Sequence, residues 1–218
     1  MGGNLGGMTS ENGRRAGSDG RRAGGDRRRV AGGATNGGGG ASWAAVEAAV
    51  PEFAAVVRER FGAYRHHVLA TLRTDGAPRL TGLEADFRRG ELWLGMMTGS
   101  RKVLDLRRDP RFALHANPGG GTDLAGGDVR VAGRAVEVTD PGLKARYAAA
   151  VKPPEPFHLF RARLTEVVRT SVEPPFMKLE IWRPDRPLRT LRRTSQDPEL
   201  LEGPERPTSE GSGGFGAP

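Results

Sequence analysis

Three short apolar segments joined by tight turns constrain the fold of this chain more than any other feature. Residues 68–72, 80–87 and 91–96 each have the length and apolar content of a β-strand. The dipeptides at 75–76 (Asp-Gly) and 89–90 (Arg-Gly), which are typical of sharp turns, separate these segments. Strands joined by such short connections pair in antiparallel fashion. The sequence therefore predicts an antiparallel meander within the chain.

The remaining apolar pattern predicts four more strands and two or three helices. The strands are expected at 111–116, 128–138, 159–172 and 176–182, and the helices at 43–61, 101–108 and 141–151. Pro51 either interrupts the first helix or opens a second one, since proline lacks an amide hydrogen and suits a first helical turn. Helices do not alternate regularly with strands. The pattern therefore favours a mainly β fold with a few helices, as a small closed or partly closed barrel.

Composition divides the chain into one domain and two tails. Residues 1–42 hold 15 of the 33 glycines, seven arginines and no aromatic residue, so they lack the apolar surface needed to offset chain entropy. Residues 194–218 are rich in Pro, Gly, Ser and Glu and are expected to behave in the same way. We therefore predict a disordered Gly/Arg-rich tail at 1–42, a domain at 43–193 and a disordered acidic tail at 194–218.

The charge of the predicted domain points to anionic ligands. It carries 26 basic against 18 acidic residues, and the charges of the two tails cancel. Such a surface attracts nucleic acid, phosphorylated cofactors or acidic metabolites. The Gly/Arg-rich tail resembles nucleic-acid-binding segments in composition, but it lacks aromatic residues that could stack on bases. A nucleic-acid partner is therefore not expected.

Two absences exclude further classes of protein. The chain has no cysteine, which rules out disulfides, thiolate metal sites and cysteine nucleophiles. No segment approaches the ~18 consecutive apolar residues of a membrane-spanning helix. The default expectation is a soluble cytoplasmic protein.

The segment Ser100-Arg101-Lys102 is the strongest local indication of a binding site. Ser100 can cap the helix predicted at 101–108, and the two cations would lie in its first turn. Free amide groups and the positive end of the helix dipole already favour an anion at this place. Cations there oppose the dipole, and a broken local rule often marks function. The segment therefore predicts a site for an anion such as a phosphate.

A family resemblance extends over most of residues 62–193. The pieces that carry it follow one another in order: Val68-Leu69-Ala70-Thr71-Leu72, Asp75-Gly76-Ala77-Pro78-Arg79, Gly90-Glu91-Leu92-Trp93-Leu94, Gly99-Ser100-Arg101-Lys102, Asp109-Pro110-Arg111-Phe112-Ala113-Leu114, Val129-Arg130-Val131-Ala132-Gly133-Arg134-Ala135 and Ile181-Trp182-Arg183. Together they resemble the pyridoxamine 5'-phosphate oxidase-like family of flavin-binding proteins. The resemblance implies a split β-barrel, FMN as cofactor, oxidoreductase activity, and a homodimer with the cofactor at its interface.

The same resemblance assigns residues to the cofactor phosphate. Ser100, Arg101 and Lys102 match the residues that hold it in the family. Thr81 occupies a place from which the preceding strand offers a polar group to the cofactor. Asp128 stands where relatives often carry an amide, so no cofactor contact is assigned to it.

Residues around the cofactor ring follow from the resemblance as well. The strand that includes Gly95, Met96, Met97 and Thr98 would pass under the ring, with Thr98 hydrogen-bonded to the cofactor and the two methionines as an apolar floor. Plain core packing explains the methionines equally well. Trp182 matches loosely a tryptophan that approaches the ring from the other subunit.

Several functional alternatives stay open at this point. The C-terminal substrate-binding pattern of true pyridoxamine phosphate oxidases is not found, so vitamin B6 chemistry is not expected. The wider family also includes enzymes that use the deazaflavin F420, and flavin- or haem-binding proteins without turnover. We name no general acid or base, and the sequence does not identify the substrate.

Other polar residues were considered as catalytic or metal-binding groups. His66, His67, His115 and His158 do not combine with an acid at a spacing typical of metal ligands, so no metal site is expected. One of the adjacent histidines, 66 or 67, is expected to be buried and hydrogen-bonded. Glu84 and Asp86 would face the same side of a strand, where a solvated or salt-bridged surface is favoured over an acid–base pair.

Overall fold

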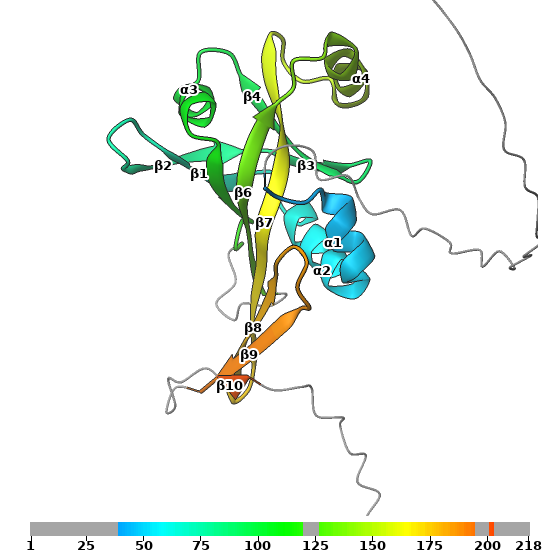
Figure 1. Cartoon of the computed structure of the whole chain (residues 1–218), viewed down its shortest axis with the longest axis vertical. Helices are drawn as coiled ribbons and strands as arrows, with labels where there is room; N and C mark the ends of the chain where they lie inside the picture. The colour runs from blue at the N-terminus through cyan, green and yellow to red at the C-terminus, as the bar shows by residue number, and fades with distance from the viewer. Residues whose placement is uncertain (1–38, 120–126, 195–200, 203–218) are drawn as a thin grey trace, which may run out of the picture. The chain divides into compact units, whose positions relative to one another are not determined.

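The computed structural model describes residues 39–119, 127–194 and 201–202, and within them the fold is mainly antiparallel β with four helices (Figure 1). The helices are α1 (Trp43–Ala49), α2 (Pro51–Gly62), α3 (Arg101–Arg108) and α4 (Pro141–Val151). The strands are β1 (His67–Leu72), β2 (Pro78–Leu83), β3 (Ala85–Arg88), β4 (Glu91–Met97), β5 (Arg111–His115), β6 (Asp128–Glu137), β7 (Phe157–Glu173), β8 (Phe176–Trp182), β9 (Arg189–Arg193) and β10 (Leu201–Glu202).

The strands close into a barrel. Hydrogen-bonded pairs form most of the ring, and the chain connection between β2 and β3 completes it. Strand β1 pairs with β2 and β5, β5 with β6, β6 with β7, and β7 with β4, which also pairs with β3. Only Glu84 separates β2 from β3, so the chain itself joins the two ends of the ring. This arrangement confirms the expected split barrel.

The 17-residue strand β7 forms the spine of the sheet. Its first residues pair with β4, and its last residues pair with β8, while β6 lies along its other edge. Figure 1 shows this strand running from the vicinity of α4 to the hairpins formed by β8, β9 and β10. The barrel and the β8–β10 extension are therefore parts of one continuous sheet.

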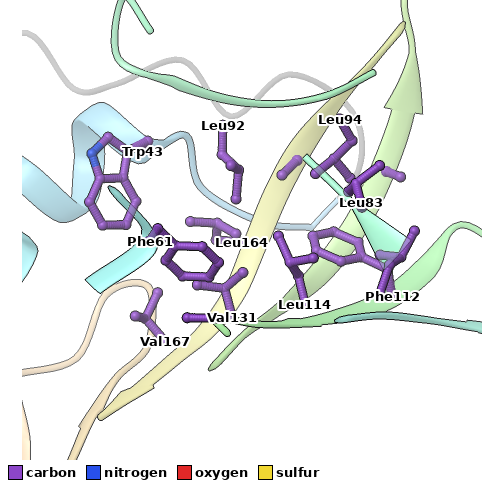
Figure 2. Packing of buried hydrophobic residues seen from close by; sticks show 14 of the residues in the cluster. Trp43, Phe61, Leu83, Leu92, Leu94, Phe112, Leu114, Val131, Leu164 and Val167 are labelled. Atoms are coloured by element: carbon purple, nitrogen blue, oxygen red, sulfur yellow. The ribbon is translucent and has the colours of Figure 1, made fainter. Parts of the chain in front are cut away.

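The main core fills the barrel interior. Along β4 the side chains of Leu92, Leu94 and Met96 belong to this core, as the two-residue period of a strand requires. Trp43 and Phe61 enter from α1 and α2 and pack with Leu164 and Val167 of β7 among the residues shown in Figure 2. Burial of these apolar surfaces is the main force that holds the helices on the barrel.

A smaller cluster lies on the outside of the barrel beneath α4. Trp93 and Leu159 face outwards from β4 and β7 and pack with Tyr147 of the helix and with Phe157. Burial, with a smaller effect of the Asp86 carboxylate, raises the pKa of Tyr147 to about 12, so its phenol stays protonated. On the outward face of β4, Trp93 is therefore covered by α4, whereas Met97 at the end of the strand is exposed.

Several predicted boundaries agree with the structure and others do not. The helices at 101–108 and 141–151 are confirmed, and Pro51 occupies the first turn of a separate helix, α2. The single strand predicted at 80–87 is wrong: Glu84 interrupts it, and the halves pair with different neighbours. Strands β9 and β10 were not predicted, because Arg-rich β9 and two-residue β10 lack a clear apolar alternation.

The described domain reaches beyond the predicted limits of 43–193. Ala41 forms a β-bridge with Leu164, and residues 201–202 pair with β9. The rest of both predicted tails, 1–38, 195–200 and 203–218, lies outside the described residues.

Gly133 offers a test of the barrel register. The β6–β7 pairing shifts between Ala132 and Gly133, and a Cβ added at Gly133 would lie 2.0 Å from the backbone oxygen of Arg163. We expect Gly133→Ala to lower the free energy of unfolding by about 2–4 kcal/mol, because the two strands must move apart. Gly62→Ala, whose added Cβ meets no atom within 4 Å, is the control. Urea denaturation of both variants measures the effect, and equal stabilities would contradict this reading.

Candidate functional site

Helix α3 forms the centre of the candidate site and lies against the barrel through its apolar face. Val103 and Leu106 are buried in the main core, whereas Arg101 and Leu104 are exposed. Ser100 is the N-cap residue, as predicted, but its side chain makes no capping hydrogen bond. Ser100 therefore caps the helix through its backbone position alone, and its hydroxyl group is available to another hydrogen-bond partner.

Asp105 anchors this helix to β1 and β2. Its carboxylate, 5% exposed, accepts hydrogen bonds from Arg79 Nε at 2.6 Å and from Thr71 Oγ1 at 2.9 Å. Arg108 adds a longer contact to the other oxygen at 3.4 Å. Burial acts to raise the pKa of Asp105, but the hydrogen bonds from Arg79 and Thr71 outweigh it and hold the pKa below its ordinary value. Asp105 is therefore an ionised link between the helix and the barrel wall.

The other flank of α3 is fixed by a second carboxylate. Arg107 donates to both oxygens of Glu137, at 2.7 and 2.8 Å, and the ring of His158 lies within 3.2 Å of both partners. The hydrogen bond from Arg107 outweighs burial and keeps the pKa of Glu137 below its ordinary value. Helix α3 is thus held from β2 on one side and from β6 and β7 on the other.

The side chain of Lys102 reaches β2 next to Thr81, another residue that the sequence assigns to a cofactor site. The Nζ atom of Lys102 donates to the carbonyl oxygen of Gly82 at 2.6 Å, one residue beyond Thr81 in β2. Burial lowers the pKa of Lys102, since a partly desolvated ammonium is less stable than one in water. An anion bound beside Nζ would offset this penalty.

Two residues close to this contact in the sequence carry buried hydroxyl groups without a partner. Ser100 Oγ and Thr81 Oγ1 are inaccessible to solvent and make no hydrogen bond within the described part of the chain. A buried hydroxyl without a partner costs free energy, so native structures rarely leave one unsatisfied. A phosphate next to Lys102 would accept hydrogen bonds from such hydroxyls and from the free amides of α3. The residues present therefore fit a phosphorylated cofactor.

The remaining predicted residues lie in different surroundings. Arg101 and Thr98 are exposed near the start of α3, and Met97 is 69% exposed at the end of β4. Met96 points into the core instead, so its side chain cannot share an apolar floor with that of Met97. Trp182 is 2% exposed and also packs in the core, enclosed by its own chain. Contacts of Met96 and Trp182 with the cofactor stay predictions, and the burial of both side chains within the chain disfavours them.

The expectation that Glu84 and Asp86 share one face of a strand is wrong. Glu84 lies between β2 and β3 and contacts Arg65 at 3.0 Å and His66 at 3.4 Å. Asp86 belongs to β3 and pairs with Arg88 at 3.1 Å. The break in the strand separates the two carboxylates into surface ion pairs, which agrees with the salt-bridged alternative.

The histidines do not form a common site. His67 is buried beside Phe61 and accepts a hydrogen bond from the amide of Asn117, which confirms that one of the adjacent pair is buried. Burial, together with the nearby His66, lowers the pKa of His67 and favours its neutral ring. His115 instead contacts Asp128 at 3.0 Å. Asp128 Oδ1 is buried without a partner among the described residues, so this carboxylate is only half satisfied.

Comparison with models of protein families shows the family to which the chain belongs. The model of the family described as pyridoxamine 5'-phosphate oxidase matches residues 53–170, more than half of the sequence. The chain belongs to the pyridoxamine 5'-phosphate oxidase-like family. The match includes β1 to β6, α3 and most of β7, and hence every residue of the Ser100–Lys102 site. A comparison with curated proteins finds no match.

Solved structures of similar proteins include several with different descriptions. The protein Atu2129 of Agrobacterium tumefaciens, of unknown function, is 22% identical with a TM-score of 0.45, over 56% of this chain and 57% of that one. General Stress Protein 26 of Bacillus anthracis is 18% identical with a TM-score of 0.45, over 59% and 96%. A heme binding protein of Mycobacterium smegmatis is 15% identical with a TM-score of 0.40, over 66% and 90%. The chain thus spans little more than half the length of Atu2129.

Two further findings concern the described residues only. They contain no group of three or more His, Asp or Glu side chains placed to hold a metal ion. None of their helices is both long and apolar enough to cross a membrane.

Sequence reasoning missed the link from Arg79 and Thr71 to Asp105. These residues are 26 and 34 positions away from Asp105, so no local pattern joins them. A weak signal exists, because Thr71 and Asp105 each stand between two apolar neighbours. A buried polar residue of this kind needs a partner, but only the fold supplies it.

Removal of the Asp105 carboxylate tests the role of this link. We expect Asp105→Ala to lower the free energy of unfolding by about 3–5 kcal/mol, because Arg79 loses its buried counter-charge. Glu59→Ala, on the exposed face of α2, should change it by less than about 0.5 kcal/mol. Since the folded pKa of Asp105 is lowered, its contribution is present above the ordinary value of 3.8 and disappears as pH falls through the folded value. Urea denaturation of the wild type and both variants at neutral and acidic pH measures the loss of stability and its pH dependence. A loss of less than about 1 kcal/mol for Asp105→Ala at neutral pH would contradict the structural role of Asp105.

Proposed function

We propose that the chain is an FMN-binding oxidoreductase of the pyridoxamine 5'-phosphate oxidase-like family. The observation that carries the proposal is the contact of the half-buried Lys102 with the carbonyl oxygen of Gly82, since Ser100 and Thr81, within two residues of its ends, carry buried hydroxyls without a partner. When bound, FMN would supply the hydride chemistry. The protein would hold the phosphate and orient the rest of the cofactor.

Each residue of the site has a distinct part in this proposal. Lys102 would place a positive charge next to the phosphate, and Ser100 and Thr81 would donate hydrogen bonds to its oxygens. Arg101, exposed at the first turn of α3, would add a second cation from the solvent side. Asp105 would act only through the position of the helix, because its carboxylate is already satisfied by Arg79 and Thr71.

We further propose that the functional unit is a homodimer with the cofactor near the interface. The outward residues Val68 and Leu80 are 42% and 69% exposed on neighbouring strands, and Ala70 lies directly opposite Leu80. This apolar surface borders Gly82, the residue that accepts the hydrogen bond from Lys102. A second copy covering the surface would also exclude water from the cofactor.

Titration with candidate cofactors tests the proposed function. We expect FMN to bind with quenching of its fluorescence, and to bind more tightly than either F420 or haem. The bound FMN should then lose its visible absorbance when NADPH or NADH is added without oxygen. Tighter binding of F420 would indicate a deazaflavin reductase, and stable binding without reduction would indicate a carrier or sensor. Either outcome would overturn the proposed activity.

A substitution at Lys102 tests the phosphate site itself. We expect Lys102→Ala to weaken FMN binding at least about tenfold, since a charge-assisted contact to the phosphate is lost. Riboflavin, which lacks the phosphate, should bind the variant and the wild type alike. Arg73→Ala removes an exposed positive charge from the β1–β2 turn and serves as the control. Equal FMN affinities of the Lys102 and Arg73 variants would contradict the assignment.

The homodimer is tested by placing a charge on the apolar surface. Leu80→Arg is expected to shift the protein from dimer to monomer in sedimentation equilibrium, because the interface would have to bury an unpaired cation. Ala55→Arg, on the exposed side of α2, should leave the mass unchanged. A monomeric wild type would refute the proposal.

A further inference from the structure

The part of the chain that follows β9 carries a charge opposite to that of the sheet before it. Residues 169–193, from the last residues of β7 to the end of β9, include seven basic and three acidic residues. Residues 195–218 include five acidic residues and one arginine. Opposite charges that are joined by a short length of chain are held at a high effective concentration, so even a weak attraction brings them together.

Strand β9 concentrates the positive charge of this part of the sheet. Three of its five residues are arginine and none is acidic. Arg192 lies directly opposite Lys178 of β8, so the pairing of the strands brings two cations together. Glu173 and Glu180 contact Lys178, at 3.3 and 3.6 Å. In the part of the chain that the structure describes, the side chains of Arg192 and Arg193 make no hydrogen bond or ion pair.

The acidic part of the chain returns along this strand at β10. Figure 1 shows β10 beside β9, and in their register Leu201 lies opposite Arg192 and Glu202 opposite Leu191. The arginines at 189 and 193 are two positions on either side of residue 191, so they share its face of the strand. If the same register continued, Glu205 would come level with residue 188, next to the first arginine of β9.

Leu191 gives an independent indication that β9 is covered. Its side chain is 2% exposed, although it belongs to neither of the two core clusters. Without β10, β9 would be the edge strand of the sheet. An edge strand presents unpaired amide and carbonyl groups on which another chain can pair. The burial of Leu191 and the pairing at β10 both point to a cover that comes from the chain itself.

We propose that the acidic C-terminal segment, residues 201–210, docks on the arginines of β9 within the same molecule. Its glutamates at 202, 205 and 210 balance the charge of the arginines at 189, 192 and 193. The segment has only one large apolar residue, Leu201, so the contact rests on charge and on strand pairing rather than on a core of its own. By occupying β9, the segment keeps other polyanions and other sheet edges away from this strand.

A spin label on the segment tests the proposal. The chain has no cysteine, so Thr208→Cys creates a single site for a nitroxide in the full-length protein. We expect the label to broaden the backbone amide signals of β9 and to leave those of β2 unchanged. The broadening should disappear at about 1 M salt, at which the screening length falls to about 3 Å.

Matched substitutions separate the charges of the segment from charge in general. The triple change of the glutamates at 202, 205 and 210 to glutamine should abolish most of the broadening. Glu52→Gln, Glu59→Gln and Glu155→Gln together remove three exposed acids elsewhere and should leave it unchanged. On the other side of the contact, Arg192→Gln with Arg193→Gln should reduce the broadening, whereas Arg73→Gln, at the exposed β1–β2 turn, should not.

Three results would overturn the proposal. The first is no broadening at β9, and the second is broadening that persists equally in high salt and in the triple glutamine variant. The third comes from mixing spin-labelled protein with isotope-labelled protein that has no spin label. Equal broadening of β9 in that mixture would show that the segment of a second copy is the occupant.

The outcome is independent of the proposed cofactor. No cofactor takes part in the measurement, and Lys102→Ala should show the same broadening of β9 as the wild type. The amide spectrum of each variant also shows whether the fold is retained. Failure of the FMN proposal would therefore leave the result at β9 readable.

Discussion

The buried contact of Asp105 with Arg79 and Thr71 is the interaction on which the candidate site depends. It joins α3 to β1 and β2, and this places Lys102 of the helix against Gly82 of β2. A helix of eight residues is too short to be stable in isolation, so its position and its persistence both come from tertiary contacts. The pair of Arg107 with Glu137 links the opposite flank of the helix to β6.

The barrel explains why such a short helix can be held so firmly. Its ring of strands is closed by the chain between β2 and β3, and the long strand β7 connects it with the β8–β10 extension. Thr71 and Glu137 share the inward faces of β1 and β6 with apolar residues such as Leu69, Val131 and Ala135. The same wall therefore supplies burial for Val103 and Leu106 and hydrogen bonds for the charged residues of α3.

Different amounts of the site could be read from the sequence. The motif Ser100-Arg101-Lys102 was recognisable because the chemistry of a helix end depends on adjacent residues. Its place in the order of segments that resemble the family strengthened the prediction. The burial of Met96 and Trp182 was not recognisable, because an apolar residue on a strand can face either side until the register is known. The break at Glu84 was missed for a similar reason: the residues on both sides have strand character, and only their different partners separate β2 from β3.

The sequence by itself determined the local elements, since turn dipeptides, helix caps and the period of apolar residues act over a few neighbouring positions. It determined the strands at 91–97 and 176–182 closely and the helices α3 and α4. It also led to the prediction of an anion site at the start of α3. Only the tertiary structure decided which distant groups meet: Gly82 with Lys102, Asp105 with Arg79, and Arg183 with Arg130 through Glu166. The physical reason is that these contacts follow from strand pairing and barrel closure, in which the burial of the whole core outweighs any local preference.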